Sequence, residues 1–191
     1  MLMTVAVTDA LISFYARCEK LWQESNYQPQ QAFDPDWDSP CFVVDEESVE
    51  AGYRSWHPVK RAEKISFSNI ETALNIELDP QIEAFFGAYF SDHMAARYQD
   101  EVIELVQVWS EDDFERLQEN MIAHLMMKKT LKQSPTLFIA SCEDDMEIIA
   151  LDNVTGEVVR ELLGKDKSEV LTPDLASFLN ALNPIIVAQA D

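Results

Sequence analysis

The chain has 191 residues, of which 35 are acidic and 14 are basic, so its formal net charge at pH 7 is −21. Hydrophobic residues make up 47% of the chain, which is enough for a buried core and unlike the low hydrophobicity of disordered acidic chains. A length of this order suits one domain, and we expect residues 1–191 to form a single unit. A protein with so large a negative charge repels phosphate groups. This disfavours nucleic acid and bare anionic lipid, and it favours a basic protein surface or a divalent cation as partner.

The sequence lacks the short motifs that mark nucleotide binding and thiol redox chemistry, and it lacks a membrane span or a signal peptide. Its four glycines form neither a G-x-G-x-x-G nor a Walker-type loop. Cys18, Cys41 and Cys142 form no C-x-x-C pair and read as reduced, packed thiols. The longest nearly apolar run, residues 84–90, is much shorter than the roughly 18 residues of a membrane span, and no basic residue precedes Arg17 as in a signal peptide. We therefore expect a cytosolic protein that does not insert into the membrane by itself.

The first predicted element is an amphipathic helix. Apolar side chains recur at three- and four-residue spacing from Leu11 to Trp22, the pattern of a helix with one buried face. Thr4 or Thr8 is expected to cap its start, and its end is expected near Ser25. The next stretch, to Pro40, is rich in Gln, Asp and Pro and predicts a loop.

Two short strands are predicted next, over residues 41–44 and 53–57, and we expect them to pair. The basic residues that follow, Lys60, Arg61 and Lys64, are expected to be solvated loop residues.

Two short helices then precede a hairpin. One helix is predicted after Ser68, and Asp79-Pro80 predicts the cap and first residue of the other. A strand through Ala96 and Tyr98 and another over residues 102–108 are expected to form the hairpin.

The strongest helix signal starts at Ser110. Its hydroxyl is placed to accept from the backbone N–H of Asp113, and the Asp113 carboxylate is placed to accept from the N–H of Ser110, which is a capping box. Apolar residues from Phe114 to Leu125 line one face, and lysines gather at the end, where the helix dipole is negative.

The last third predicts an antiparallel meander of three strands, residues 136–140, 146–151 and 157–162. Thr172-Pro173 predicts the cap and first residue of a final amphipathic helix that Pro184 ends. Strands in antiparallel groups, with helices between and beside them, indicate an α+β fold. We expect a single domain with a mixed, mostly antiparallel sheet flanked by helices.

No convergent reactive groups are indicated. His57, His93 and His124 are far apart and lack zinc-ligand spacing, and no nucleophile motif is present. His124 lies at the edge of the apolar face of its helix and is expected to be packed and bonded to a neighbour. The interpretation is a protein that is not an enzyme and needs no cofactor or metal.

Calcium binding is the most specific alternative function that the sequence suggests. Asp34, Asp36 and Asp38 alternate as the first ligands of an EF-hand loop do. Ser39 stands where that loop needs glycine, and Asp45 stands where it needs glutamate. A solvated acidic loop is favoured, and a calcium-responsive acidic binding module is kept as the alternative function.

Acidic residues gather in three clusters, residues 34–50, 111–119 and 143–147. Like charges packed together oppose folding through their mutual repulsion. The clusters are therefore equally consistent with a surface that binds a cationic partner and with the plainer interpretation of solubility and helix-dipole matching.

One long pattern resembles a known family. Trp109-Ser110-Glu111-Asp112-Asp113-Phe114, Pro135-Thr136-Leu137-Phe138-Ile139-Ala140 and Ala176-Ser177-Phe178-Leu179-Asn180 are similar to the Syd family of SecY-interacting proteins. The resemblance spans nearly the whole chain. It implies an α+β domain related to the SUKH superfamily that attaches loosely to the cytoplasmic side of the inner membrane. The implied partner is SecY, the channel subunit of the Sec translocon, which the family binds through an acidic concave surface.

Cytoplasmic loops of membrane channels carry excess Lys and Arg, so this acidic chain complements the basic loops of SecY. Trp109 and Trp37 are candidates for added aromatic contact area, against the commoner role of a tryptophan in the core. Asp113 is the residue whose cap role competes with binding. The predicted partner-binding residues are Glu111, Asp112, Asp113, Glu143, Asp144, Asp145, Asp45, Glu46, Glu47 and Trp109.

Overall fold

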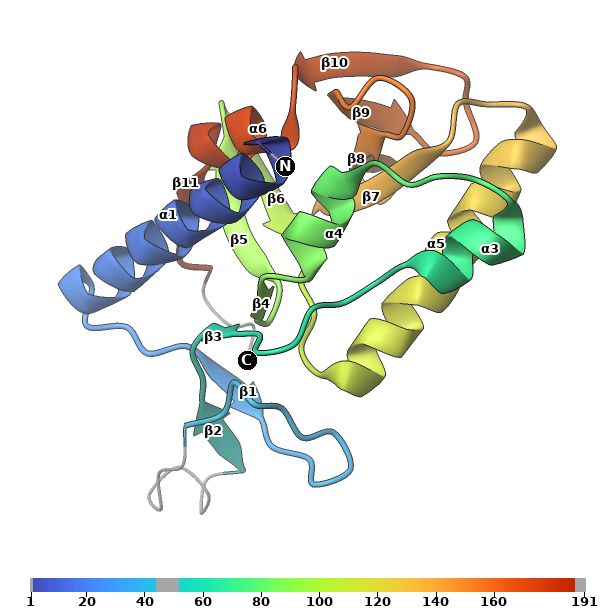
Figure 1. Ribbon diagram of the computed structural model, residues 1–191. Helices are drawn as coiled ribbons and strands as arrows, with labels where there is room; N and C mark the ends of the chain where they lie inside the picture. The colour runs from blue at the N-terminus through green and yellow to red at the C-terminus, as the bar shows by residue number, and fades with distance from the viewer. Residues whose placement is uncertain (1, 44–51, 188–191) are drawn as a thin grey trace.

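A seven-stranded antiparallel sheet forms the centre of the computed structural model, which describes residues 2–43 and 52–187 (Figure 1). Its strand order is β10-β9-β8-β7-β6-β5-β11. The strands are β5 (Met94–Tyr98), β6 (Glu101–Leu105), β7 (Thr136–Cys142), β8 (Glu147–Asp152), β9 (Val158–Leu162), β10 (Ser168–Thr172) and β11 (Asn183–Pro184). The sheet curls so strongly that β5 and β10 meet across four intervening strands. There the Tyr98 hydroxyl of β5 donates to the Leu171 carbonyl of β10 at 3.1 Å.

The helices lie around this sheet, with α1 beside α6 at one side of the molecule and α5 at the other (Figure 1). They are α1 (Leu2–Glu24), α3 (Ser68–Leu74), α4 (Pro80–Phe86), α5 (Glu111–Leu131) and α6 (Leu175–Ala181). The core gathers large side chains from these helices, including Phe14, Phe85 and Phe178, all fully buried. Two small antiparallel pairs complete the fold, β1 (Gln30–Ala32) with β2 (Tyr53–Ser55) and β3 (Val59–Lys60) with β4 (Tyr89–Phe90).

The predicted α+β class is confirmed, as are several elements. The meander appears as β7, β8 and β9, and the hairpin as β5 and β6. Asp79 caps α4 by accepting from the Gln81 N–H at 2.9 Å, and Pro80 is the first helical residue. Each of these predictions rested on signals that lie within a few residues of the element.

The predicted start of the first helix is wrong. The helix α1 begins at Leu2, and Thr4 and Thr8 lie inside it. The Thr8 hydroxyl donates to the Thr4 carbonyl one turn earlier, at 3.2 Å, so threonine is satisfied within the helix and does not cap it. Val7 and Ala10 are buried and extend the apolar stripe towards the start.

The predicted pairing of residues 41–44 with 53–57 occurs as a single bridge between Phe42 and Trp56. The strand β2 pairs instead with β1, inside the stretch expected to be a loop. Val44 lies outside the described residues. A strand of three residues, Gln-Gln-Ala, is too short to carry a periodic signal, so its partner decides its conformation.

The final helix also starts later than predicted. Asp174 caps α6 by accepting from the Ser177 N–H at 2.7 Å, whereas Thr172 ends β10. The predicted cap at Thr172 is therefore wrong, because an unpredicted strand extends through that residue.

Candidate partner-binding groove

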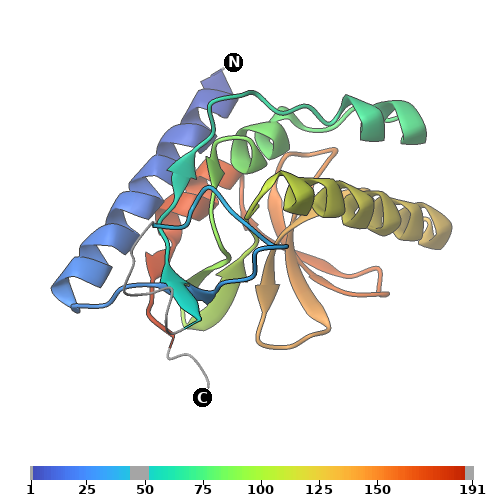
Figure 2. The ribbon, with the colours of Figure 1, turned by 90° about the horizontal axis from the view of Figure 1, so that it is seen from below.

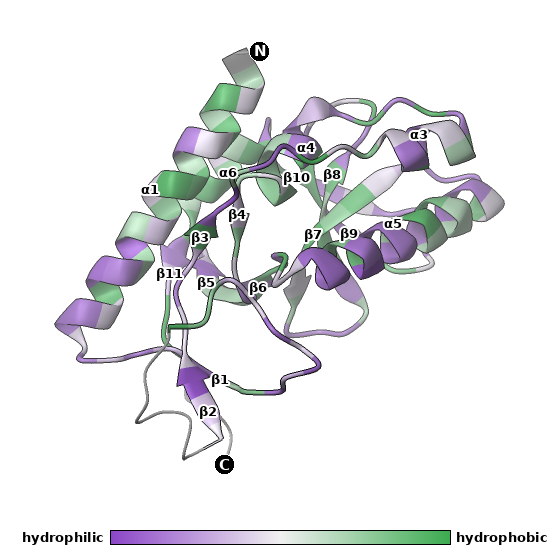
Figure 3. Ribbon diagram, turned by 60° about the horizontal axis from the view of Figure 1, so that its bottom comes forward, coloured by the Kyte–Doolittle hydropathy of each residue, from purple (hydrophilic) through white to green (hydrophobic). Residues whose placement is uncertain are grey.

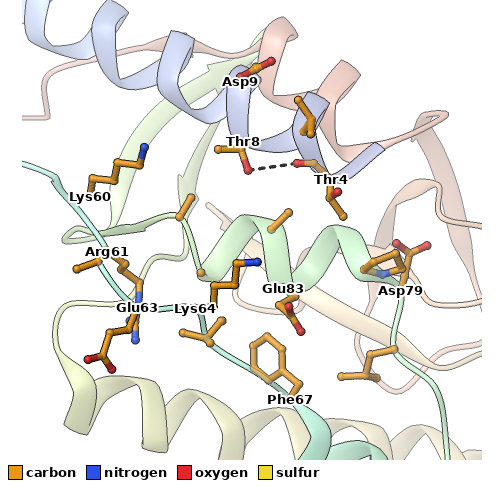
Figure 4. A pocket seen from close by; sticks show the side chains of 18 of the residues that line it. Thr4, Thr8, Asp9, Lys60, Arg61, Glu63, Lys64, Phe67, Asp79 and Glu83 are labelled. Atoms are coloured by element: carbon orange, nitrogen blue, oxygen red, sulfur yellow. Dashed lines mark hydrogen bonds between the residues drawn. The ribbon is translucent and has the colours of Figure 1, made fainter. Parts of the chain in front are cut away.

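An open groove of about 670 Å³ lies between the first turns of α1, the segment of residues 60–65 and α4 (Figure 4). Residues from Thr4 to Asp9 form one wall, the segment 60–65 forms the other, and α4 lies between them. Small or apolar side chains, Val5, Ala84 and Ala88, contribute to its lining.

Gly87 makes this arrangement possible. A Cβ built on Gly87 would lie 2.7 Å from Cγ1 of Ile65, so only glycine lets the wall approach the end of α4 so closely. The backbone N–H of Arg61 donates to the Ala88 carbonyl at 3.0 Å and holds the same wall. Close packing at this point therefore sets the shape of the groove.

The groove is mainly acidic. Six carboxylates line it against three basic side chains. The carboxylates are those of Asp9, Glu63, Glu71, Glu77, Asp79 and Glu83, and the basic residues are Lys60, Arg61 and Lys64. Glu71 and Asp79 already accept backbone N–H groups, whereas Asp9, Glu63, Glu77 and Glu83 are exposed.

Arg61 corrects the prediction of a solvated basic loop. Its side chain is only 3% exposed, and Nη2 donates to both carboxylate oxygens of Glu111 at 2.7 Å. The guanidinium also lies 4.0 Å from the centre of the Phe90 ring, a cation–π distance. Lys60 and Lys64 are exposed as predicted. The ion pair joins the groove wall to the start of α5, so Glu111 has a structural role.

The start of α5 is hydrophilic (Figure 3). Its predicted cap is confirmed for the Ser110 side chain but not for the Asp113 side chain. The Ser110 hydroxyl accepts from the Asp113 N–H at 3.2 Å. The Asp113 carboxylate, however, accepts from the Trp109 N–H at 2.8 Å and not from that of Ser110, and Arg116 lies 3.5 Å from it. Asp113 is thus engaged locally, while Asp112 is exposed.

The tertiary structure brings the described part of the first acidic cluster to this helix start. Arg116 stacks 3.7 Å from the centre of the Trp37 ring, and the Ser39 hydroxyl donates to the Trp109 carbonyl at 2.6 Å. The loop that carries Asp34, Asp36 and Asp38 therefore lies against the first turns of α5. Two acidic segments that are far apart in the sequence therefore lie side by side in the structure.

The third cluster does not lie beside these two segments. Glu143, Asp144 and Asp145 are exposed in the β7–β8 turn. The register that pairs Cys142 with Ile103 puts this turn beyond the start of β6, whereas the chain reaches α5 from the end of β6. Figure 2 shows the turn well apart from the start of α5. Asp45, Glu46 and Glu47 lie outside the described residues.

Trp109 is a core residue in this structure. It is 5% exposed and makes edge-to-face contacts with Phe42 and Trp56, at ring-centre distances of 5.0 and 5.8 Å. It holds the acidic loop and the start of α5 together from beneath, and Trp37 is the more accessible of the two tryptophans.

Two of the aspartates that were considered as calcium ligands, Asp34 and Asp38, accept hydrogen bonds from the backbone of their own loop. The Asp36 N–H donates to Asp34, and the Ser39 N–H donates to Asp38, each at 2.9 Å. Over residues 2–43 and 52–187, no group of three or more His, Cys, Asp or Glu is placed to hold a metal ion. Asp45, the proposed last ligand, is outside these ranges.

The histidines and cysteines do not converge in either hollow. The groove contains neither, and a second hollow of about 410 Å³ at the end of α1 contains His57 without a cysteine. As predicted, His124 is packed and bonded, 3.1 Å from the Thr136 hydroxyl. Burial raises the pKa of the Cys41 thiol to about 11 and that of Cys18 to about 12, so both are protonated and poorly nucleophilic at neutral pH.

Sequence reasoning missed the acidic residues of α4 and its approach, Glu77 and Glu83, and it missed Glu63. They are isolated in the sequence and belong to no cluster. The only signal was the Asp79-Pro80 helix start, which placed α4 but not its neighbours in space.

The fold and the groove define a class of protein, an acidic α+β domain with an open, charged groove. Within the described ranges, none of the helices combines the length and apolarity that crossing a bilayer requires. Comparison with known proteins narrows the class to a family.

A family profile described as Syd protein (SUKH-2) matches residues 8–184. The chain is 46% identical over 178 residues to protein Syd of Psychromonas ingrahamii, covering 93% of this chain and 95% of that protein. It is 41% identical over 181 residues to protein Syd of Cronobacter sakazakii, covering 94% and 98%. It is also 35% identical over 182 residues to protein Syd of Pseudoalteromonas atlantica, covering 95% and 98%. The chain belongs to the Syd family.

Proposed function

We propose that this protein binds the basic cytoplasmic loops of SecY without catalysing a reaction, as a loosely held peripheral protein on the cytoplasmic side of the inner membrane. The observation that carries the proposal is the acidic face at the start of α5. There the loop of residues 34–39 packs against the start of α5 through Trp37 and Ser39, close to the exposed Asp112 and Glu115 of α5 and beside a groove lined by six carboxylates. Membership of the Syd family supports SecY as the partner.

Electrostatics explains how such a face works. A net charge of −21 attracts basic loops over a long range and raises the association rate. Exposed carboxylates then accept charge-assisted hydrogen bonds from Lys and Arg side chains. The excess of Lys and Arg on the cytoplasmic side of membrane channels makes SecY loops suitable donors.

The predicted residues have different parts in this proposal. Asp112 is exposed and directly available, and Glu115 on the next turn joins it. Glu111 and Asp113 are engaged with Arg61 and Trp109, so they shape the face more than they bind through it.

The test compares two charge reversals in a pull-down with SecY-containing membranes. The variant Asp112→Lys/Glu115→Lys changes the α5 face. The matched control Glu143→Lys/Asp145→Lys changes the net charge by the same amount in the separate β7–β8 turn. We expect the first variant to lose binding and the second to retain most of it. Both should remain folded at the assay temperature, with a small loss of stability in the first from the reversed charges at the start of α5.

The proposal also requires that wild-type binding weakens as salt is raised, because exposed charge pairs are screened. Equal loss in both variants would mean that only total charge matters. Loss in the β7–β8 variant alone would move the site to that turn. Either result would overturn the assignment to α5.

A further inference from the structure

The charges that line the groove are divided along α4. Glu77 and Asp79 precede the helix and Glu83 lies within it. The wall that carries Lys60 and Lys64 meets the other end of α4, since Lys60 pairs with Tyr89 and Ile65 packs against Gly87. The start of α4 is therefore acidic. Lys60 lies towards the other end together with Glu63 of the same wall, and Lys64 extends from that wall over the helix (Figure 4).

Lys60 and Lys64 keep their charge available to a ligand. In residues 2–43 and 52–187, no carboxylate lies within 4.0 Å of either ammonium group, although six line the same groove. Figure 4 shows Lys64 extending over α4, while the carboxylate of Glu63 points towards α5. Arg61 differs from both, because Glu111 already neutralises it.

An all-basic segment would fit only half of this groove. Its positive side chains would gain at Glu77 and Glu83 and would meet like charges at Lys60 and Lys64, which disfavours binding. A segment with basic residues at one end and acidic residues at the other would gain at both ends.

From this division we infer that the groove selects a partner segment of mixed charge. Its basic residues lie at the start of α4, its acidic residues lie at Lys60 and Lys64, and small apolar residues lie between them over Ala84 and Ala88. The inference rests on the proposed function and names the chemistry of the segment that enters the groove. The charge division also gives the bound segment a fixed direction.

The length of α4 sets the spacing of that segment. Seven helical residues extend over about 10 Å, which about three residues of extended chain also cover. Two matched peptides follow from this, Lys-Lys-Ala-Val-Ala-Glu-Glu and Lys-Lys-Ala-Val-Ala-Lys-Lys. They share length and apolar residues and differ only at the end that should meet the lysines.

The experiment measures the affinity of both peptides by calorimetry for the wild type and for Lys60→Glu/Lys64→Glu. We expect the wild type to bind the mixed peptide several-fold more tightly, and the variant to prefer the all-basic peptide. A wild type that prefers the all-basic peptide would overturn the inference, as would a variant whose preference does not change.

A third protein, Glu77→Lys/Glu83→Lys, separates this inference from groove docking itself. Both peptides should lose affinity for it, because both carry the same basic end. If neither peptide responds to this variant, the groove is not the binding site and docking there is refuted. If both respond but the lysine variant changes no preference, only the mixed-charge inference is refuted.

Discussion

The charged residues at both ends of α5 match the helix dipole, but those at the start are mostly exposed and those at the end include a buried ion pair. Acidic residues occupy the positive start of the helix and lysines its negative end, as the helix dipole favours. At the start, Glu111 is 66% exposed and pairs with a buried arginine of the groove wall. At the end, Lys128 and Glu161 are only 7% and 6% exposed and pair at 2.7 Å.

This difference shows that charge alone does not mark a binding residue. The buried pair at the end of α5 joins the helix to β9, and Glu161 also accepts from the Thr136 hydroxyl. The exposed charges at the start remain accessible to a partner. Substitutions at the two ends should therefore separate stability from binding.

The largest effect on stability is expected for Glu161→Ala. It leaves the Lys128 ammonium buried without its carboxylate, and removing one partner of a buried ion pair costs about 3–5 kcal/mol. Denaturant unfolding measures the loss, and Lys129→Ala, an exposed lysine on the same turn, should change stability by less than about 0.5 kcal/mol. Similar values for both variants would show that the buried pair has no special role.

Glu111→Ala should cost less, about 1–3 kcal/mol. Arg61 loses the acceptor of two hydrogen bonds, but Glu111 itself lies at the surface, where water replaces part of what is lost. Asp112→Ala on the same turn is the control for the helix dipole and should cost only the dipole contribution of one exposed carboxylate, about 0.3–1 kcal/mol. If the two variants unfold alike, the Arg61–Glu111 pair does not hold the groove wall.

A smaller effect of opposite sign is expected at Lys132. This residue ends α5 in the left-handed conformation, with φ at 56°, which glycine adopts without the steric penalty of a Cβ. We expect Lys132→Gly to stabilise the protein by roughly 0.5–1 kcal/mol relative to Lys132→Ala, which removes the same charge. Thermal unfolding of the two variants checks this, and a less stable glycine variant would contradict it.

The smallest effect is a pH dependence at His124. Burial lowers the pKa of its imidazole, while Glu161 raises it and Lys128 lowers it further. The unfolded chain therefore takes up the proton first as the pH falls below about 6.5, so stability present at pH 7.5 declines towards pH 5. His124→Gln removes this component. Its stability difference from the wild type should change over that range, and a constant difference would refute the assignment.

The sequence predicted the elements whose signals lie within a few neighbouring residues, and it did not predict contacts between distant segments. The Ser110 cap and the Asp79-Pro80 start were predicted because cap and helix lie within three residues of each other. The pairing of β1 with β2 was not predicted, since a strand of three residues is too short to show a period and the choice of partner depends on the rest of the fold.

The candidate site shows the same limit. The acidic residues at the start of α5 were found as a cluster in sequence, but their meeting with the loop of Asp34 depends on Trp37, Arg116 and Trp109. The groove joins α1, residues 60–65 and α4, three segments without a shared motif. Arg61 looked like a surface residue because its partner, Glu111, is 50 positions away.

The amino-acid sequence by itself determined the charge of the protein, its α+β class, the caps of α4 and α5 and the family pattern, since these follow from composition and from neighbours along the chain. Only the tertiary structure decided which charges are buried in pairs, which face a groove and which clusters meet. Those outcomes depend on distances between residues far apart in sequence, and packing of the whole core sets them.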